Sequence, residues 1–446
     1  MNQVEDVEVV LTHARRYKFH SGTLARNSTV LAGMLTEQNA AKLSNRAKNA
    51  NVHTRWMVEL KHLPDREHPA GLMGLVELNS SGERADGRSG LIPNENGRVP
   101  TKIFDHYEAI LYAFYNKEIR ISDADMRSAL EDVTQMVSIA EYLGCLAVVS
   151  KPVEVALLKH GQNLYRSIQA MPGSWIGMSM SIKSESIFKE AMIHLVGNWP
   201  RVKKHAMPAL KDYPAVKELV EKHRGALMKK GKKIDTGVMS LYPGDMCAPS
   251  QDLPIKREDY SRDVLIWIAL TWFRHWVGQR LIMGKGHTGE DSGFELYRQI
   301  GAAGEAYMDK VVINQFHGKF PMTKKALNVC ENHLLEIKEC MKNFIDKQGV
   351  LEVKCELDVH KYPVPYLTCI DFNRDDLPWL EHEKQQKQVA GTKRGVRPGG
   401  NAIARQNLQA ASREQAGVDV DDGSAGEESE EEAWDKDESR KRARRA

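Results

Sequence analysis

Residues 284–289, GKGHTG, combine glycine with basic side chains in a way that suggests phosphate binding. A P-loop needs a glycine, four residues, Gly-Lys and then a Ser or Thr hydroxyl that reaches the metal. Gly286 stands where that hydroxyl should be, and a helical rather than a strand-like pattern precedes the motif. We therefore interpret these residues as a flexible turn and expect no nucleotide site here.

A second stretch, residues 289–294 (GEDSGF), superficially resembles the surroundings of a serine nucleophile. Nucleophilic serine needs a partnered histidine and a preformed oxyanion site, and neither pattern is visible. Asp291 and Ser292 are good residues for a helix start, so we predict that they begin a helix over residues 294–300.

Possible metal ligands occur on a predicted helix that carries Cys330, His333 and Cys340, with Cys355 and Cys369 further along. Cys330 and His333 share a helix face at i,i+3, as two metal ligands can. A Cys-x-x-Cys pair is missing, so we favour core cysteines and a surface histidine. We predict no catalytic residues, no cofactor and no metal site, and hence a protein that is not an enzyme.

The elements that position these residues are mostly helices, because apolar residues recur at helical spacing over long stretches. Residues 353–359 and 362–370 show a short β-like alternation instead. We expect Pro152 in the first turn of its helix and a helix break at Trp199-Pro200. The predicted helices cover residues 105–119, 125–143, 153–168, 185–196, 213–228, 263–283, 293–315 and 323–347.

Composition limits the class of protein. The 446 residues exceed one ordinary domain, the hydrophobic fraction of 41% can build real cores, and a net charge of +3 demands no nucleic acid. Six scattered cysteines and a polar start indicate a reduced, intracellular protein that is not secreted. The apolar run 264–273 is shorter than a bilayer span, so we predict a buried helix with Trp267, Trp272 and Trp276 as core anchors.

Beyond about residue 381 the apolar periodicity disappears, and we expect a disordered tail. Residues 427–432 are acidic and precede Trp434; they either form an interaction tail or shield the basic end. Residues 440–445, RKRARR, suit a nuclear import signal, with nucleic-acid contact or a solvated tail as alternatives. The import signal consists of Arg440, Lys441, Arg442, Arg444 and Arg445.

The N-terminal third carries the most informative pattern. An extended segment at residues 16–20 runs into two short helical patterns, and Asn27 or Ser28 suits the cap of the second. Phe19 and His20 are followed by Leu24, Ser28, Met34 and Leu35. With strands at 7–11 and 55–60 and helices at 104–115 and 126–146, this pattern resembles a BTB/POZ domain over residues 7–170. The resemblance is closest to uncharacterised BTB proteins of filamentous fungi.

The resemblance implies an α+β fold class and a domain organisation. Residues 1–170 are expected to form a BTB/POZ-like domain with a short three-stranded sheet and a mobile insertion at 79–100. Residues 171–380 are expected to form a mainly helical domain, and residues 381–446 the tail. Two residues depart from the family pattern, because Asn116 and Lys117 stand where Thr-Gly is usual.

The resemblance also implies a function, namely a protein–protein interaction adaptor or scaffold in the nucleus or shared between nucleus and cytoplasm. One alternative is a substrate adaptor that recruits a cullin scaffold of a ubiquitin ligase, for which Leu35-Thr36-Glu37 is a loose match. Another is a transcription-associated co-regulator. Expected partners are a second copy of the chain or a cullin, plus an import receptor. The predicted partner surface consists of Leu35, Glu37, Tyr107, Leu111 and Tyr115.

Overall fold

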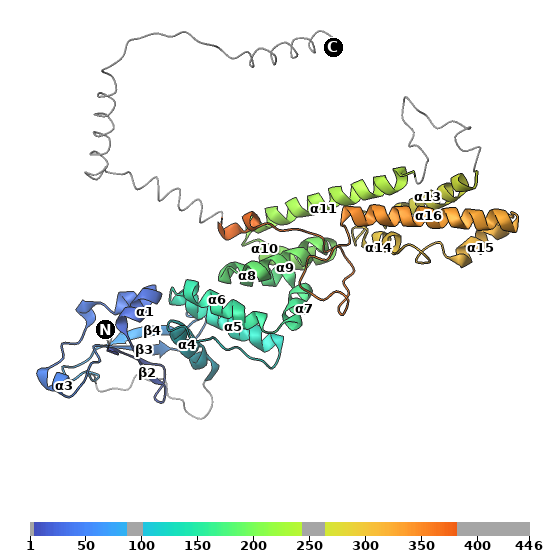
Figure 1. Cartoon of the computed structure of the whole chain (residues 1–446). Helices are drawn as coiled ribbons and strands as arrows, with labels where there is room; N and C mark the ends of the chain where they lie inside the picture. Colours follow the sequence, from blue (N-terminus) through green and yellow to red (C-terminus); the bar gives the residue numbers. More distant parts are fainter. Residues whose placement is uncertain (1–3, 87–100, 243–263, 381–446) are drawn as a thin grey trace, which may run out of the picture. The chain divides into compact units, whose positions relative to one another are not determined.

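The structure is a computed structural model that describes residues 4–86, 101–242 and 264–380 (Figure 1). Within them the fold is mixed α+β, with one small sheet near the N-terminus and helices over the remainder. No described helix combines the length and the apolar character needed to cross a membrane.

The sheet contains β1 (Val7–Val10), β2 (Arg16–Phe19), β3 (Trp56–His62) and β4 (Leu72–Val76) in the order β2-β1-β3-β4. Its two hairpin pairs are antiparallel, and β1 and β3 pair in parallel. It therefore has four strands rather than the predicted three. Alternation sorts its faces, since Val9 and Val58 join the main core whereas Val10 and Met57 pack on the other side.

Short helices connect the strands. They are α1 (Ser21–Asn27), α2 (Thr29–Met34), the 3₁₀ turn η1 (Glu37–Asn39) and α3 (Asn45–Asn49). Ser28 caps α2 as predicted, because its Oγ accepts from the Leu31 N–H and donates to the Leu143 carbonyl. Of the predicted insertion, residues 79–86 form a tight turn in which Arg84 binds the buried Glu59 at 2.7 Å. Residues 87–100 lie outside the described residues.

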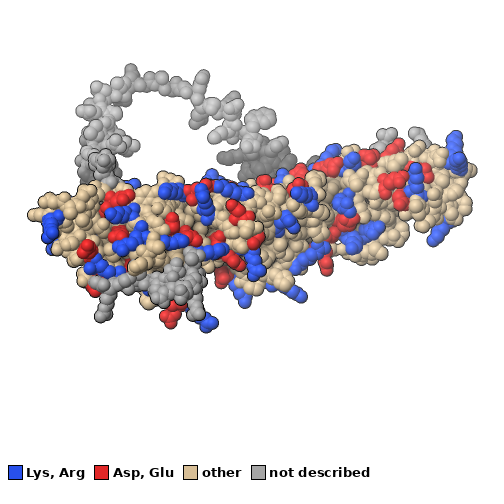
Figure 2. All heavy atoms as spheres, turned by 90° about the horizontal axis from the view of Figure 1, so that it is seen from below, with Lys and Arg blue, Asp and Glu red and all other residues tan. Residues whose placement is uncertain are grey.

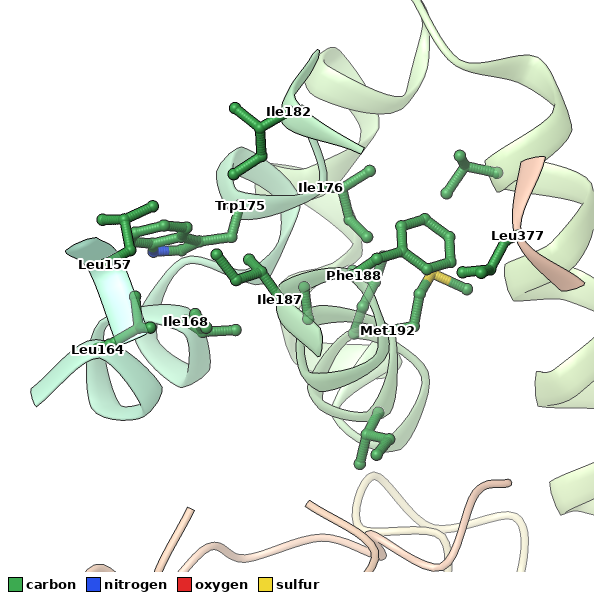
Figure 3. Close-up of a cluster of buried hydrophobic side chains, with 14 of the residues drawn as sticks. Leu157, Leu164, Ile168, Trp175, Ile176, Ile182, Ile187, Phe188, Met192 and Leu377 are labelled. Carbon is green, nitrogen blue, oxygen red and sulfur yellow. The ribbon is translucent and has the colours of Figure 1, made fainter. Parts of the chain in front are cut away.

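Seven helices follow, and each packs on its neighbours in the main core. Figure 3 shows part of this packing, with the buried Trp175 beside Leu157 and the buried Phe188 beside Met192. The helices are α4 (Thr101–Ala113), α5 (Met126–Tyr142), α6 (Leu146–Leu158), α7 (Gln162–Ala170), α8 (Pro172–Ile182), α9 (Glu185–Gly197) and α10 (Trp199–Leu210).

The long helices α11 (Pro214–Ser240), α13 (Val264–Ile282) and α16 (Lys324–Gln348) pack along one another, with α14 (Phe294–Ala302) against α16 (Figure 1). The short helix α15 (Lys310–Lys319) precedes α16. Residues 349–373 contain no helix or strand, so the predicted β-like segments there are wrong. The 3₁₀ turn η2 (Arg374–Asp376) follows them.

Candidate functional site

Most of the residues predicted as a partner surface are buried or half-buried in this structure. Tyr107 and Leu111 are fully buried in the core, and Leu35 is 8% exposed. Tyr115 is half-buried, and its hydroxyl accepts from the backbone N–H of His20 at 2.9 Å. Only Glu37 of this set is exposed, where it pairs with Arg55. The helical period located the apolar face of α4, and that face is buried in the main core.

Many of the exposed apolar side chains belong instead to the second half of the chain. Ile282 is 89% exposed, Met283 69% and Phe320 60%. Val264, Val311, Val312 and Leu335 also lie open to solvent. Most of the large exposed apolar side chains among the described residues thus belong to α13, α15, α16 and the turns that flank them. Such side chains mark an interaction surface when they occur together.

Aromatic stacking joins the helices that carry these side chains. The rings of Trp272 on α13 and Phe316 on α15 stack with centroids 4.2 Å apart, and Phe316 lies 5.1 Å from Phe320. Trp276 stacks on Tyr307 at 4.6 Å. The tryptophans of α13 are half-buried and pack against the core. The stacked rings connect α13 with α15 and leave Phe320 at the outer end, facing solvent.

A buried lysine fixes the turn that joins α14 and α15. Lys338 of α16 is 2% exposed, and its ammonium donates to the carbonyls of Gly304, Tyr307 and Met308 at 2.6, 2.7 and 3.1 Å. Burial lowers the pKa of Lys338, while Glu305 and Asp309 act in the opposite direction. The turn also contains Ala303 and Met308 at positive φ. Three charged hydrogen bonds thus hold a strained turn between α14 and α15.

The glycine-rich turn at 284–289 binds a carboxylate of its own chain. Asp235 of α11 accepts from the backbone N–H of His287 at 3.0 Å, and the same oxygen lies 2.6 Å from His287 Nδ1. Tyr297 donates its hydroxyl to the other oxygen at 2.7 Å. A pocket of about 480 Å³ opens beside this pair, lined by Asp235, Thr236, Met239, Ser240, Leu281, Gly286, His287 and Thr288.

Ser292 has a structural position in the fold and is not presented to solvent. It is 2% exposed, and its Oγ accepts from Arg224 at 2.6 Å. Asp291 accepts from the backbone N–H groups of Gly293 and Glu295, which fixes the start of α14. No histidine contact to Ser292 is recorded among the described residues.

Cysteine and histidine meet at a place that the sequence pattern did not indicate. Cys330 is buried in α16, and His333 lies 3.1 Å from Glu336. By contrast, Glu190 and His194 of α9 lie beside Cys355, with one ligand atom from each residue within 4.8 Å of the others. Burial raises the pKa of the Cys355 thiol to about 11. In the sequence, the i,i+4 spacing of Glu190 and His194 indicates that the two side chains share a helix face. It does not indicate Cys355, which is remote in sequence.

Charge is finely mixed on the surface. On the face drawn in Figure 2, Lys and Arg side chains alternate with Asp and Glu, and uncharged surface lies between them. Mixed charge of this kind suits protein partners better than a polyanion. The predicted basic signal at 440–445 and the acidic run at 427–432 lie outside the described residues.

Comparison with protein families gives a match in the second half of the chain. The fungal FF domain family model matches residues 243–347, which include α13 to α15 and nearly all of α16. No curated protein and no solved structure matches the chain. No BTB/POZ family model matches, so the assignment of residues 7–170 to that family is wrong. FF domains mediate protein interactions, and the match therefore supports protein binding as the general role.

The BTB/POZ interpretation relied on few residues. Phe19, Leu24 and Ser28 do occupy a strand, a helix and a helix cap as expected. Such a sequence of capped short helices satisfies general rules of local folding and does not define one family. The cullin alternative rested on this resemblance alone and loses its support with it.

Proposed function

We propose that this chain is a non-catalytic adaptor that binds other polypeptides through the apolar surface of α13, α15 and α16. The observation that carries the proposal is the position of Ile282, Met283 and Phe320, which lie exposed within or next to elements that match an interaction domain. A partner segment that covers these side chains gains the free energy of apolar burial, about 25 cal/mol per Å². Neighbouring polar side chains then form the rim of the interface.

The experiment starts from tagged full-length protein and from variants that place a charge on the surface. Phe320→Asp and Ile282→Asp should each weaken binding at least tenfold, because a buried unpaired charge is costly in an interface. Met171→Asp is the matched control, since Met171 is also 52% exposed but lies outside the matched region. A partner recovered with the wild-type chain is purified and its dissociation constant is measured with each variant.

Two results decide the proposal. Loss of the purified partner in both surface variants, with Met171→Asp unchanged, supports it. Equal binding by all variants, or failure of any purified protein to bind the wild-type chain, contradicts it. Circular dichroism and the unfolding midpoint establish that the variants are folded.

We further propose that the protein acts in the nucleus, at least for part of its life. The support is the sequence RKRARR at 440–445, whose closely spaced cations suit an import receptor. Deleting residues 440–445 should abolish nuclear accumulation of a fluorescent fusion, whereas deleting the acidic residues 427–432 should not. Unchanged nuclear accumulation after the first deletion would contradict this part of the proposal.

A further inference from the structure

The segment 349–373 is held in place by polar contacts at its centre. It contains neither helix nor strand, yet Leu357, Tyr366 and Leu367 within it are 1–2% exposed. Glu190 of α9 accepts from the backbone N–H groups of Glu356 and Leu357 at 2.8 and 3.1 Å. Burying the Glu190 carboxylate costs free energy unless the charge is compensated, so we expect a partner that binds it.

Three metal-ligating side chains converge at this anchor. Glu190 is 2% exposed and His194 is fully buried, and Nε2 of His194 lies 3.1 Å from a carboxylate oxygen of Glu190. Cys355 approaches from the irregular segment, so that one carboxylate oxygen, one ring nitrogen and the sulfur all lie within 4.8 Å of one another. Helix spacing i,i+4 places the first two ligands on one face.

We propose that Glu190, His194 and Cys355 form a zinc site that fastens the segment 349–373 to α9. Thiolate, imidazole and carboxylate are the ligand types that Zn²⁺ takes in proteins. Three protein ligands leave the fourth tetrahedral position to water, and Cys355 is only partly buried, which gives a small ligand access.

Contacts around the ligands resemble the outer shell of a metal site. Nδ1 of His194 lies 2.9 Å from the hydroxyl of Tyr366, and that ring lies edge-on to the imidazole. Metal-bound histidine usually has such a partner on its second nitrogen, which fixes the ring and its tautomer. The two backbone N–H groups on Glu190 orient the carboxylate in the same way.

Metal binding has a defined proton balance. Without metal, Tyr366 donates to Nδ1, and the Nε2–H of His194 donates to Glu190. With Zn²⁺ bound to Nε2, the ring proton is carried on Nδ1 and is donated to the Tyr366 oxygen, and the tyrosyl proton turns away from the ring. Cys355 loses its thiol proton to solvent, so one proton is released for each zinc.

The test measures metal in the full-length chain. Wild-type protein stripped with a chelator and reloaded should retain one zinc per chain, and Co²⁺ in its place should show a thiolate-to-cobalt absorption band. Cys355→Ser should abolish that band, and Tyr366→Phe should weaken metal affinity 10- to 100-fold, as outer-shell changes do. Cys340→Ser is the control, since Cys340 is also partly buried but lies on α16.

Several outcomes would overturn the site. They are a wild-type chain that retains neither metal, a cobalt complex without the thiolate band, and Cys355→Ser binding as tightly as wild type. Each of these results would show that Glu190, His194 and Tyr366 form a hydrogen-bond network without a metal. Should Cys355→Ser fail to fold, His194→Gln offers a second ligand variant, and the cobalt spectrum of the wild-type chain decides by itself. Partner binding through α13 and α15 is measured separately, so the two proposals fail independently.

Discussion

Lys338 shows how one side chain can hold a turn in place. Its ammonium satisfies three carbonyls that no helix uses, within a pocket closed to water. Lys338→Met keeps an unbranched side chain but removes the ammonium and leaves those carbonyls without donors. We expect a loss of about 2–4 kcal/mol in the free energy of unfolding, measured with urea.

The control for Lys338 lies one helical turn further along α16. Lys342 is partly exposed, and its ammonium comes no closer than 4.0 Å to Glu339, so Lys342→Met should change stability by less than about 0.5 kcal/mol. Equal stability of the Lys338→Met variant and wild type would show that the ammonium does not hold the turn.

His106 predicts a pH dependence. Its side chain is buried, and Nδ1 has no hydrogen-bond partner among the described residues. Burial lowers its pKa, although Asp132 at 3.3 Å acts in the opposite direction. The unfolded chain therefore binds a proton first as pH falls below about 6.5, and the folded chain loses stability there.

The expected measurement is the free energy of unfolding at several pH values between 7.5 and 5. Wild type should become less stable toward pH 5, by at most about 1.4 kcal/mol per pH unit from this one group. His106→Gln should make that slope shallower. An unchanged slope would show that His106 binds its proton equally well in both states.

At the scale of elements, sequence periodicity located most helices and misplaced their ends. The predicted helix 153–168 is two helices, because Gly161 adopts a φ of 52° between α6 and α7. Pro152 lies inside α6 rather than in its first turn. Trp199 and Pro200 begin α10, since proline is tolerated in a first turn. Likewise, Ala303 and Gly304 at positive φ divide the predicted helix 293–315.

The candidate sites were harder to predict, for a physical reason. An amphipathic pattern marks a buried face, so Tyr107 and Leu111 stood out although they belong to the core. Exposed apolar side chains such as Ile282 and Phe320 do not belong to the helical repeat of apolar residues, so the repeat does not predict them. Glu190 and Cys355 are brought together only by tertiary packing, which spacing along the chain does not encode.

Helix α9 approaches the irregular segment 349–373 closely at Gly197. A Cβ added there would lie 2.2 Å from the Leu367 carbonyl oxygen, in the backbone of the irregular segment. Gly197→Ala should therefore cost about 1–3 kcal/mol through overpacking. Gly225 is the matched control in α11, because nothing lies within 4 Å of its added Cβ. Gly225→Ala should stabilise the protein by about 0.4–1 kcal/mol.

Thermal or urea unfolding of the two variants distinguishes crowding from helix propensity. The free energy of unfolding should fall in Gly197→Ala and rise in Gly225→Ala. If both glycine variants were stabilising, the close approach of α9 to residue 367 would not exist in solution.

At the scale of the whole chain, the main core crosses the predicted domain boundary near residue 170. Trp175 of α8 donates its indole N–H to Ser167 of α7 at 3.2 Å, and Leu157, Ile168 and Trp175 lie in one cluster (Figure 3). The same cluster of buried residues includes members from β1 through α16 and on to Leu377 and Trp379. The boundary stays a prediction, and cooperativity of unfolding is its direct test.

A continuous core predicts that the described residues unfold together. Leu60→Ala in β3 removes a fully buried side chain and should cost about 2–5 kcal/mol. If the core is one cooperative unit, the slowest-exchanging amides of α16 lose protection by the same free energy as those of β3, because both exchange only through global opening. Ile337→Ala in α16 should produce the reciprocal effect in β3. Hydrogen exchange followed by mass spectrometry reads both regions in one experiment. Were each substitution to affect only its own side of residue 170, the chain would contain two independently unfolding domains, and the contacts between α7 and α8 would be too weak to couple them.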